Sequence, residues 1–320
     1  MPDAPPVEAR GLIKRYGEVT AVDDVDLTVE AGDVYGYLGP NGAGKTTVLR
    51  MLLGLIRPTA GEVRLFGRDP LVAGAAALEG VAGFVEAPRF YPYLSGRKNL
   101  ELLAALDGGD GAAGRIEEAL DVVELTARQR HRVGGYSHGM RQRLGVAAAL
   151  IRDPKLLLLD EPATGLDPAG MRDMRALVAR LSLAGTTVLL SSHLLAEVEE
   201  LCNRVAIVRT GRIVFEGALE DLKRTAGGEW RLRTTDDTRA VAVCRAQRGI
   251  DGIRPEPLEI RFEATEEAAA ALSIALVEAG LAIRALAPHT ATLEDLFFRL
   301  TEDGPATPGG GDVAAVTETP

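Results

Sequence analysis

The chain has 320 residues, enough for two domains of ordinary size. Hydrophobic residues make up 46% of it and charged residues 26%, which is typical of a globular protein with a buried core. The formal net charge of −10 counts mildly against nucleic-acid binding, because nucleic-acid-binding domains usually carry a basic patch or a high pI. The two cysteines have no metal-site spacing and indicate free thiols in a reducing compartment.

The N-terminal residues 1–6 are rich in proline and lack the basic and apolar segments of a signal peptide. No apolar run approaches the roughly 18–20 residues that a transmembrane helix requires. We therefore expect a cytoplasmic chain that reaches a membrane only through a partner.

The first third of the chain shows strand patterns around one helix. Residues 7–32 alternate as short strands and turns, with a turn at residues 15–17. A short strand at 33–38 leads through a glycine-rich loop into a helix at 45–55, and further strands are expected at 62–66 and 81–86.

Beyond residue 88 the hydrophobic period becomes helical. Helices are predicted at 97–106, 115–125 and 137–151, with a glycine-rich turn at 107–114. The continuous apolar run at 155–160 is typical of a buried parallel strand. An amphipathic helix bearing Met171 to Leu181 follows, then a strand at 186–191 and a hairpin at 205–215 that turns at Thr210 and Gly211.

The composition shifts at residues 225–228, where we expect a linker. After it comes a β-α-β-β-α-β pattern that suits a small ferredoxin-like α+β domain, with segments at 230–234, 238–248, 253–254, 258–262, 265–280 and 282–287. A closing helix is predicted at 292–300. Residues 302–320 contain no lysine or arginine and are expected to be disordered. The predicted domains are therefore 1–224 and 225–301, followed by a tail at 302–320.

Residues 39–47 fit the pattern G-x-x-x-x-G-K-[ST] between a strand and a helix. Glycines let backbone N–H groups surround phosphate oxygens, and the helix N-terminus adds partial positive charge. Lys45 is expected to reach the β- and γ-phosphates, and the Thr46 hydroxyl to hold Mg²⁺. The sequence thus predicts an ATP site formed by Gly39, Asn41, Gly42, Ala43, Gly44, Lys45, Thr46 and Thr47.

The apolar run Leu156–Asp160 is followed directly by Glu161. An apolar strand that delivers a carboxylate is how P-loop proteins hold their metal ion. We predict Asp160 on the Mg²⁺ side and Glu161 beside the attacking water. The alternative, a solvated strand end without chemistry, is disfavoured by the P-loop upstream.

Three further motifs complete the pattern. The segment 136–143 precedes the strand at 155–161, Gly-Leu-Asp follows it at 165–167, and Ser-Ser-His stands at 191–193. In this order and spacing, the set resembles the nucleotide-binding subunits of ABC transporters over roughly residues 7–220. The resemblance implies an α/β P-loop NTPase fold with an antiparallel β subdomain and a helical subdomain.

The resemblance also implies roles for matching residues. Tyr16 is similar to the aromatic residue that stacks on adenine, Glu161 to the catalytic glutamate, and His193 to the switch histidine that contacts the γ-phosphate. Ser137, His138 and Gly139 stand where the family's signature motif contacts the nucleotide of the other subunit, and Asp167 lies in the loop that crosses the dimer.

The signature motif also implies an assembly. A serine hydroxyl, a glycine N–H and a helix N-terminus make an anion site, which in this family lies too far from its own P-loop to serve the same nucleotide. Two subunits then pair head to tail around a C2 axis. Since this chain has one P-loop, we expect a homodimer that works with polytopic membrane permease subunits, which the resemblance places beside residues 90–100.

Two residues depart from the common family pattern. His138 stands where the signature usually has glycine, and either adds a hydrogen-bond donor or packs at the interface. Glu86 stands where a Q-loop glutamine is usual. Its carboxylate either binds Mg²⁺ or orients water, at the cost of negative charge near the phosphates, or points to solvent. We predict Glu86 as a catalytic and metal-binding residue.

These departures, with residues 86–92 and 95–96, resemble the branch of exporter ATPases associated with bacitracin, lantibiotics and other drugs. Residues 228–301 are similar to an accessory domain of such subunits, which either supports or regulates dimerisation or only stabilises the chain. The predicted function is an ATP-hydrolysing exporter subunit on the inner face of the cell membrane.

The alternative is a non-transport ABC ATPase that acts on nucleic acid or the ribosome. It is disfavoured by the single P-loop, by the lack of a large insertion before residue 136 and by the acidic charge. We therefore expect no nucleic-acid partner.

Overall fold

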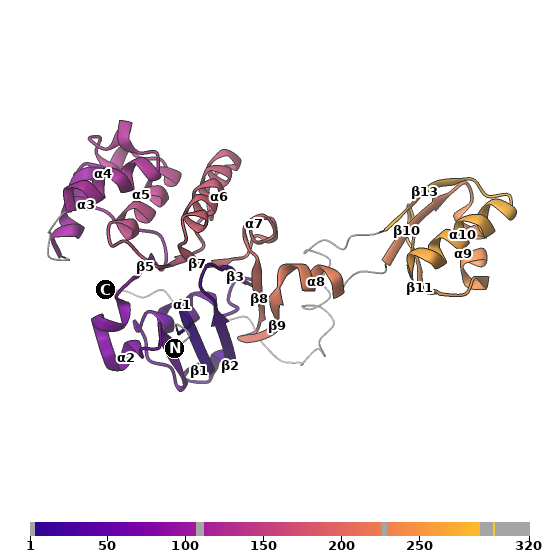
Figure 1. Cartoon of the computed structure of the whole chain (residues 1–320), viewed down its shortest axis with the longest axis horizontal. Helices are drawn as coiled ribbons and strands as arrows, with labels where there is room; N and C mark the ends of the chain where they lie inside the picture. Colours follow the sequence, from indigo (N-terminus) through magenta and orange to yellow (C-terminus); the bar gives the residue numbers. More distant parts are fainter. Residues whose placement is uncertain (1–3, 107–111, 226–228, 289–296, 298–320) are drawn as a thin grey trace.

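The computed structural model describes residues 4–106, 112–225, 229–288 and 297. Two sheets and their helices form an N-terminal unit, residues 4–225, and a third sheet with two helices forms a C-terminal unit, residues 229–288 (Figure 1). Among these described residues, no helix combines the length and apolar character that crossing a membrane requires.

A small antiparallel sheet opens the N-terminal unit. It consists of β1 (Val7–Tyr16), β2 (Val19–Val29) and β4 (Ala60–Leu65), in the order β2-β1-β4. The predicted short strands of residues 7–32 are thus two long strands. Tyr16 is still paired with Val19, so the predicted turn at residues 15–17 lies later, at residues 17–18.

The central sheet of the described chain has the order β5-β6-β7-β3-β8-β9. Its strands are β5 (Val81–Phe84), β6 (Leu156–Asp160), β7 (Thr187–Ser192), β3 (Val34–Leu38), β8 (Arg204–Arg209) and β9 (Arg212–Ala218). The first five run parallel, and β9 returns antiparallel. The predicted hairpin turn is confirmed, since Thr210 and Gly211 both have positive φ, as a tight two-residue hairpin requires.

Alternate leucines of β6 enter two different cores, which explains its continuous apolar run. Leu156 and Leu158 join the core beside α1 (Lys45–Leu52) and the small sheet, whereas Leu157 and Leu159 join the core beneath the larger helices. Those helices are α3 (Gly96–Leu106), α4 (Ala112–Val122), α5 (His138–Leu150) and α6 (Pro168–Leu183). Burying each leucine contributes about 1.5–3 kcal/mol, so both faces of the strand anchor the sheet.

Several short helices complete the unit. They are α2 (Pro70–Ala73), η1 (Gly74–Leu78), η2 (Thr126–Arg128), η3 (Val133–Gly135), α7 (Leu195–Leu201) and α8 (Leu219–Thr225). The sequence patterns did not predict α2 or α8. Helix α2 begins at a proline behind Asp69, whose side chain accepts a hydrogen bond from Leu71 N–H at 2.8 Å.

The C-terminal unit confirms the predicted β-α-β-β-α-β order. It runs β10 (Glu229–Thr234), α9 (Asp237–Ala246), β11 (Ile250–Pro255), β12 (Ile260–Ala264), α10 (Glu266–Glu278) and β13 (Ile283–Pro288), with sheet order β11-β12-β10-β13. Its core, around Leu232, Phe262 and Leu272, shares no residue with the other two cores. Of the predicted closing helix, only Phe297 lies within the described residues; the tail at 302–320 lies outside them. The predicted domain boundaries stay predictions.

Candidate active site

The glycine-rich loop lies at the carboxyl end of β3, which stands between β7 and β8 in the parallel part of the sheet. Gly44 ends the loop with φ +93° and precedes α1 without a side-chain cap on the helix. A Cβ atom at this position would lie 2.3 Å from the carbonyl oxygen of Ala21, so only glycine fits. The first N–H groups of α1 are left without a side-chain partner, which favours an anion in front of them.

Lys45 is buried with its ammonium group turned back over the loop. Its side chain is 6% exposed, and Nζ donates to the carbonyl oxygens of Gly39 at 2.8 Å and Pro40 at 3.1 Å. Nζ also lies 3.1 Å from Oε1 of Glu161. The lysine is therefore held by three oxygen atoms at the position where phosphate is expected.

Asp160 ends β6 and is 4% exposed. Its Oδ2 accepts hydrogen bonds from Thr46 Oγ1 at 2.9 Å and from the Glu86 N–H at 3.3 Å, and its Oδ1 accepts one from Ser191 Oγ at 2.5 Å. Residues from α1, β6 and β7 thus meet at one carboxylate, as predicted for Thr46 and Asp160. The bond from Ser191 to this carboxylate was not predicted.

Glu161 follows Asp160 with φ +50°, which turns its side chain toward the loop. Its Oε2 accepts from Thr164 Oγ1 at 2.8 Å and lies 2.6 Å from Nδ1 of His193, while Oε1 faces Lys45. Burial opposes ionisation, but the hydrogen bonds from Thr164 and His193, together with Lys45, hold the pKa of Glu161 below its ordinary value. The group is a carboxylate at neutral pH.

The side chain of Glu86 does not lie where its predicted metal-binding and catalytic roles would require. Its main-chain N–H contacts Asp160, but its side chain is 55% exposed and pairs with the guanidinium of Arg50. The structure therefore brings the backbone of Glu86 to the site, while its carboxylate pairs with Arg50 of α1. The predicted metal and catalytic roles of Glu86 gain no support from this placement.

The predicted signature residues lie apart from the loop of the same chain. Ser137 caps α5 by accepting from Met140 N–H at 3.2 Å, and it lines a hollow of about 390 Å³ with His138 and Gly139. The lining of this hollow includes Asp167, which caps α6, but no residue of the loop at 39–47. The signature segment and the loop at 39–47 therefore do not share this hollow.

His138 is already engaged inside its own chain. Its Nε2 lies 3.1 Å from the carbonyl oxygen of Thr164, the residue whose hydroxyl donates to Glu161. This contact lies within one chain, so the two alternatives for His138, an added hydrogen-bond donor or packing at the interface, both stay open. It also connects the start of α5 to the loop after β6.

Tyr16 lies at the end of β1 with 48% of its side chain exposed, and Lys14 Nζ is 5.0 Å from the ring centroid. Its partner strand β2 continues to Ala21, which abuts Gly44. The ring is therefore exposed on the hairpin that borders the phosphate loop, as an adenine-stacking residue requires.

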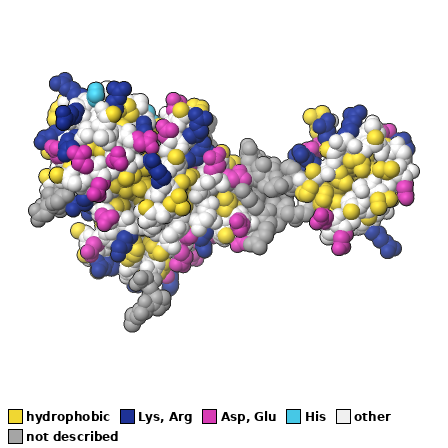
Figure 2. Space-filling model, turned by 45° about the horizontal axis from the view of Figure 1, so that its top comes forward, with side chains coloured by type: hydrophobic (Ala, Val, Ile, Leu, Met, Phe, Trp, Pro, Cys, Tyr) yellow, Lys and Arg dark blue, Asp and Glu magenta, His cyan; other side chains and the backbone are white. Residues whose placement is uncertain are grey.

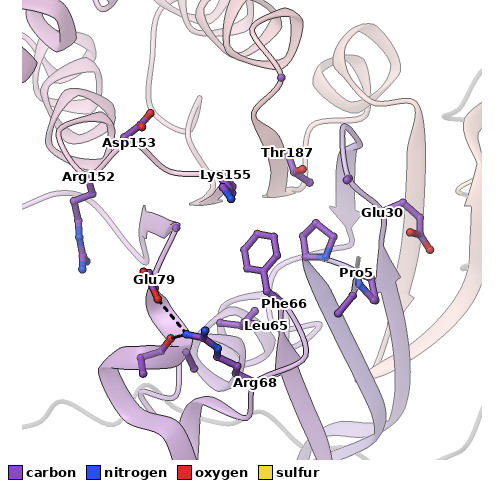
Figure 3. A pocket seen from close by; sticks show the side chains of 17 residues that line it. Pro5, Glu30, Leu65, Phe66, Arg68, Glu79, Arg152, Asp153, Lys155 and Thr187 are labelled. Carbon is purple, nitrogen blue, oxygen red and sulfur yellow. Dashed lines mark hydrogen bonds and ion pairs between the residues drawn. The ribbon is translucent and has the colours of Figure 1, made fainter. Parts of the chain in front are cut away.

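A larger hollow of about 790 Å³ lies at the opposite edge of the central sheet (Figure 3). Lys155 and Thr187, at the amino-terminal ends of β6 and β7, line it, and Arg68 bonds to Glu79 across one wall at 3.1 Å. Because the glycine-rich loop follows the carboxyl end of β3, this hollow is not where the sequence predicts nucleotide.

Comparison with known proteins decides the family. Residues 22–164 match the ABC transporter family. The chain is 36% identical to the bacitracin transport ATP-binding protein BcrA of Enterococcus faecalis, over 96% of this chain and 98% of that protein. The chain belongs to the ABC transporter family. It is also 37% identical to the daunorubicin resistance ATP-binding protein DrrA3 of Streptomyces coeruleorubidus, over 92% of this chain and 95% of that protein.

Solved structures of ABC transporter subunits have a fold similar to that of this chain. An ATP-binding subunit of an ABC transporter matches with a TM-score of 0.62 and 28% identity, covering 69% of this chain and 92% of its own. A dimeric ATP-binding cassette in a post-hydrolysis state with ADP and phosphate matches with a TM-score of 0.58 and 25% identity, covering 67% of this chain and 98% of its own. This ABC transporter subunit therefore binds and hydrolyses ATP, and the predicted P-loop NTPase fold is confirmed.

Sequence reasoning missed several polar residues of the ABC transporter site. Thr164 and Ser191 hold Glu161 and Asp160, and Ser192 bonds to the buried Glu197. The only signal was the serine pair before His193, which a hydrophobic pattern treats as part of a buried strand.

Proposed function

We propose that this chain binds Mg²⁺-ATP on residues 39–47, hydrolyses it with Glu161 and His193, and drives an export permease. The observation that supports this most strongly is the surroundings of Glu161. An ionised carboxylate lies between the P-loop lysine and a histidine, so it is poised to accept a proton from water beside bound phosphate.

The oxygen donors at Asp160 and Thr46 fit a Mg²⁺ ion. Mg²⁺ is commonly bound by one or two carboxylates, with water and phosphate as its other ligands. Asp160 and Thr46 bring a carboxylate and a hydroxyl together at 2.9 Å, and the described residues contain no cluster of three or more His, Cys, Asp or Glu side chains that would suit another metal. The bound ion would neutralise charge on the β- and γ-phosphate oxygens.

ATP binding requires the partners of Lys45 to change. In the isolated chain Lys45 is satisfied by two loop carbonyls and by Glu161. We infer that phosphate oxygens take over the ammonium group, which frees Oε1 of Glu161 for water. His193 uses Nδ1 toward Glu161, so Nε2 is the nitrogen left for a γ-phosphate oxygen.

The assembly that fits this site is a head-to-tail homodimer. Ser137, His138 and Gly139 would complete the ATP site of the partner subunit, because their hollow contains no residue of their own P-loop. A C2 pair then forms two equivalent sites, with Asp167 at the crossing loop. The dimeric cassette among the related structures supports this arrangement.

The names of the two relatives, a bacitracin transport and a daunorubicin resistance ATP-binding protein, support a drug or another antibiotic as the exported class. In this proposal, separate membrane permease subunits hold the chain at the cytoplasmic face of the membrane. In the view of Figure 2, both basic and acidic side chains appear on the surface of the described N-terminal unit.

The Glu161→Gln variant tests the proposal. It should bind ATP but lose at least about 100-fold in turnover, because the amide is no base, and it should accumulate as an ATP-bound dimer. Phosphate release and size-exclusion chromatography with ATP measure both effects. Glu62→Gln, in an exposed ion pair on β4, is the matched control. Unchanged turnover in Glu161→Gln would overturn the assignment of the base.

A further inference from the structure

Glu197 is a buried carboxyl group that the proposed mechanism does not use. It lies in the first turn of α7 and is 4% exposed. Its Oε2 accepts a hydrogen bond from Ser192 Oγ at 2.5 Å, while its Oε1 is buried with no hydrogen-bond partner in the described structure. An apolar side chain would fill this place without the desolvation cost, so packing alone does not account for a carboxyl group here.

Ser192 connects this carboxyl group to the ATP site. It is the last residue of β7 and is fully buried. Its carbonyl oxygen accepts from the N–H of Gly39, the first residue of the P-loop, at 3.2 Å. Its hydroxyl donates to Glu197 and accepts from the N–H of Leu194 at 3.0 Å.

His193 is therefore held from both sides. The hydroxyl of Ser192, one residue before His193, accepts a hydrogen bond from the N–H of Leu194, one residue after it. The same hydroxyl donates to Glu197, which fixes its direction. Without the carboxyl group, the Ser192 side chain is free to change its χ1 rotamer, which moves Oγ away from the Leu194 N–H. The turn that carries the imidazole toward Glu161 then loses this bond.

We propose that Glu197 is a positioning residue for ATP hydrolysis, which acts through the Ser192 hydroxyl to hold His193 against Glu161. The inference rests on the proposed function, because it takes His193 as the group that contacts the γ-phosphate. Glu197 itself contacts neither nucleotide nor water in the reaction.

The surroundings favour the neutral form of this acid. Burial raises the pKa of Glu197 to about 7, the Ser192 bond lowers it, nearby Glu161 raises it, and Arg175 and His193 lower it. A neutral carboxyl avoids a charge on the unpartnered Oε1. Glutamine has the same shape and keeps a carbonyl oxygen for Ser192, so it is the conservative replacement.

The experiment compares ATP turnover by the full-length chain carrying Glu197→Ala, Ser192→Ala, both changes, or Glu197→Gln. Each alanine variant should lower kcat by at least about tenfold and change KM for ATP by less than about twofold, since misplaced catalytic groups affect the reaction step more than binding. The double variant should be no slower than the slower single one, because both remove the same link. Glu197→Gln should retain kcat within about twofold.

Glu200→Ala is the matched control, because Glu200 lies on the same helix but is exposed and pairs with Arg175 at 2.5 Å. Thermal unfolding checks that each variant is folded. If Glu197→Ala does not fold, the kcat values of Ser192→Ala and Glu197→Gln still test the positioning role. Wild-type kcat in folded Ser192→Ala, losses that multiply in the double variant, or a slow Glu197→Gln would each overturn the inference.

These outcomes are separate from those of the proposed function. If Glu161→Gln keeps full turnover, the assignment of the base fails whatever the Glu197 variants do. If Glu161→Gln is inactive and the two alanine variants keep wild-type kcat, only the positioning role fails.

Discussion

Replacing Glu197 by glutamine should change how the stability of the protein depends on pH. The pKa of this carboxyl is about 7 in the folded chain against an ordinary value of 4.5. A folded pKa above the unfolded one means that the folded state favours the protonated acid. The stabilisation is therefore fully present below about pH 4.5 and is lost as the pH rises through about 7.

The size of the effect follows from the pKa difference. A difference of about 2.5 corresponds to about 3 kcal/mol of unfolding free energy, at 1.36 kcal/mol per unit. Because Glu197 is almost fully buried, solvent screening reduces this value little. Glutamine does not titrate, so the free energy of unfolding of Glu197→Gln should exceed that of the wild type by a margin that grows by about 3 kcal/mol over this range.

Urea denaturation of both proteins between pH 4.5 and 8.5 measures the margin. Glu200→Gln on the exposed side of α7 is the control and should run parallel to the wild type. The lowered pKa of Glu161 acts in the opposite direction and only at lower pH, so it does not disturb this window. Parallel curves for wild type and Glu197→Gln would refute the reasoning, because Glu197 would then ionise as it does in the unfolded chain.

Three further substitutions probe the site and its support. Gly83→Ala should cost more than about 3 kcal/mol, measured by thermal unfolding, because its Cβ would lie 1.9 Å from the carbonyl oxygen of Leu158 in the neighbouring strand. Tyr16→Ala should weaken ATP binding by about 0.5–1.5 kcal/mol in calorimetry while Tyr16→Phe does not, if the exposed ring stacks on adenine. Glu86→Gln should leave the Mg²⁺ concentration for half-maximal turnover unchanged, because this carboxylate faces Arg50; a clear shift would restore its predicted metal role.

The fold was predictable where the signal is local. The strand at 155–160 and the P-loop at 39–47 combine an apolar run, glycines and a following helix, and each lies where the pattern placed it. The ferredoxin-like order was readable because its helices and strands alternate at short intervals. Helices α2 and α8 were missed since four to seven residues carry too little periodicity to show a helical face.

The site was harder to predict because its contacts are long-range. The direction of the Glu86 side chain depends on Arg50, 36 positions earlier, and sequence spacing gives no information on that pair. The same holds for the bond between Ser191 and Asp160, 31 positions apart. Residue types predicted an ATP site, but which oxygen faces which donor follows only from the packing of β6 against β7.

The contacts of Glu161 explain why hydrolysis would depend on bound nucleotide. In the isolated chain Oε1 faces Lys45, and Oε2 has Thr164 and His193 as partners, so both carboxylate oxygens are engaged. Under the proposed mechanism, phosphate would take over Lys45 and contact His193 through Nε2, so the contacts of Glu161 Oε2 with Thr164 and with His193 Nδ1 stay in place. Since the Thr164 carbonyl oxygen contacts His138, the proposed head-to-tail dimer would let a change at the partner's nucleotide reach Glu161 through one residue. Under the proposed mechanism, ATP would free Oε1 of Glu161, while Oε2 keeps its bond to Thr164, the residue that contacts the predicted signature segment.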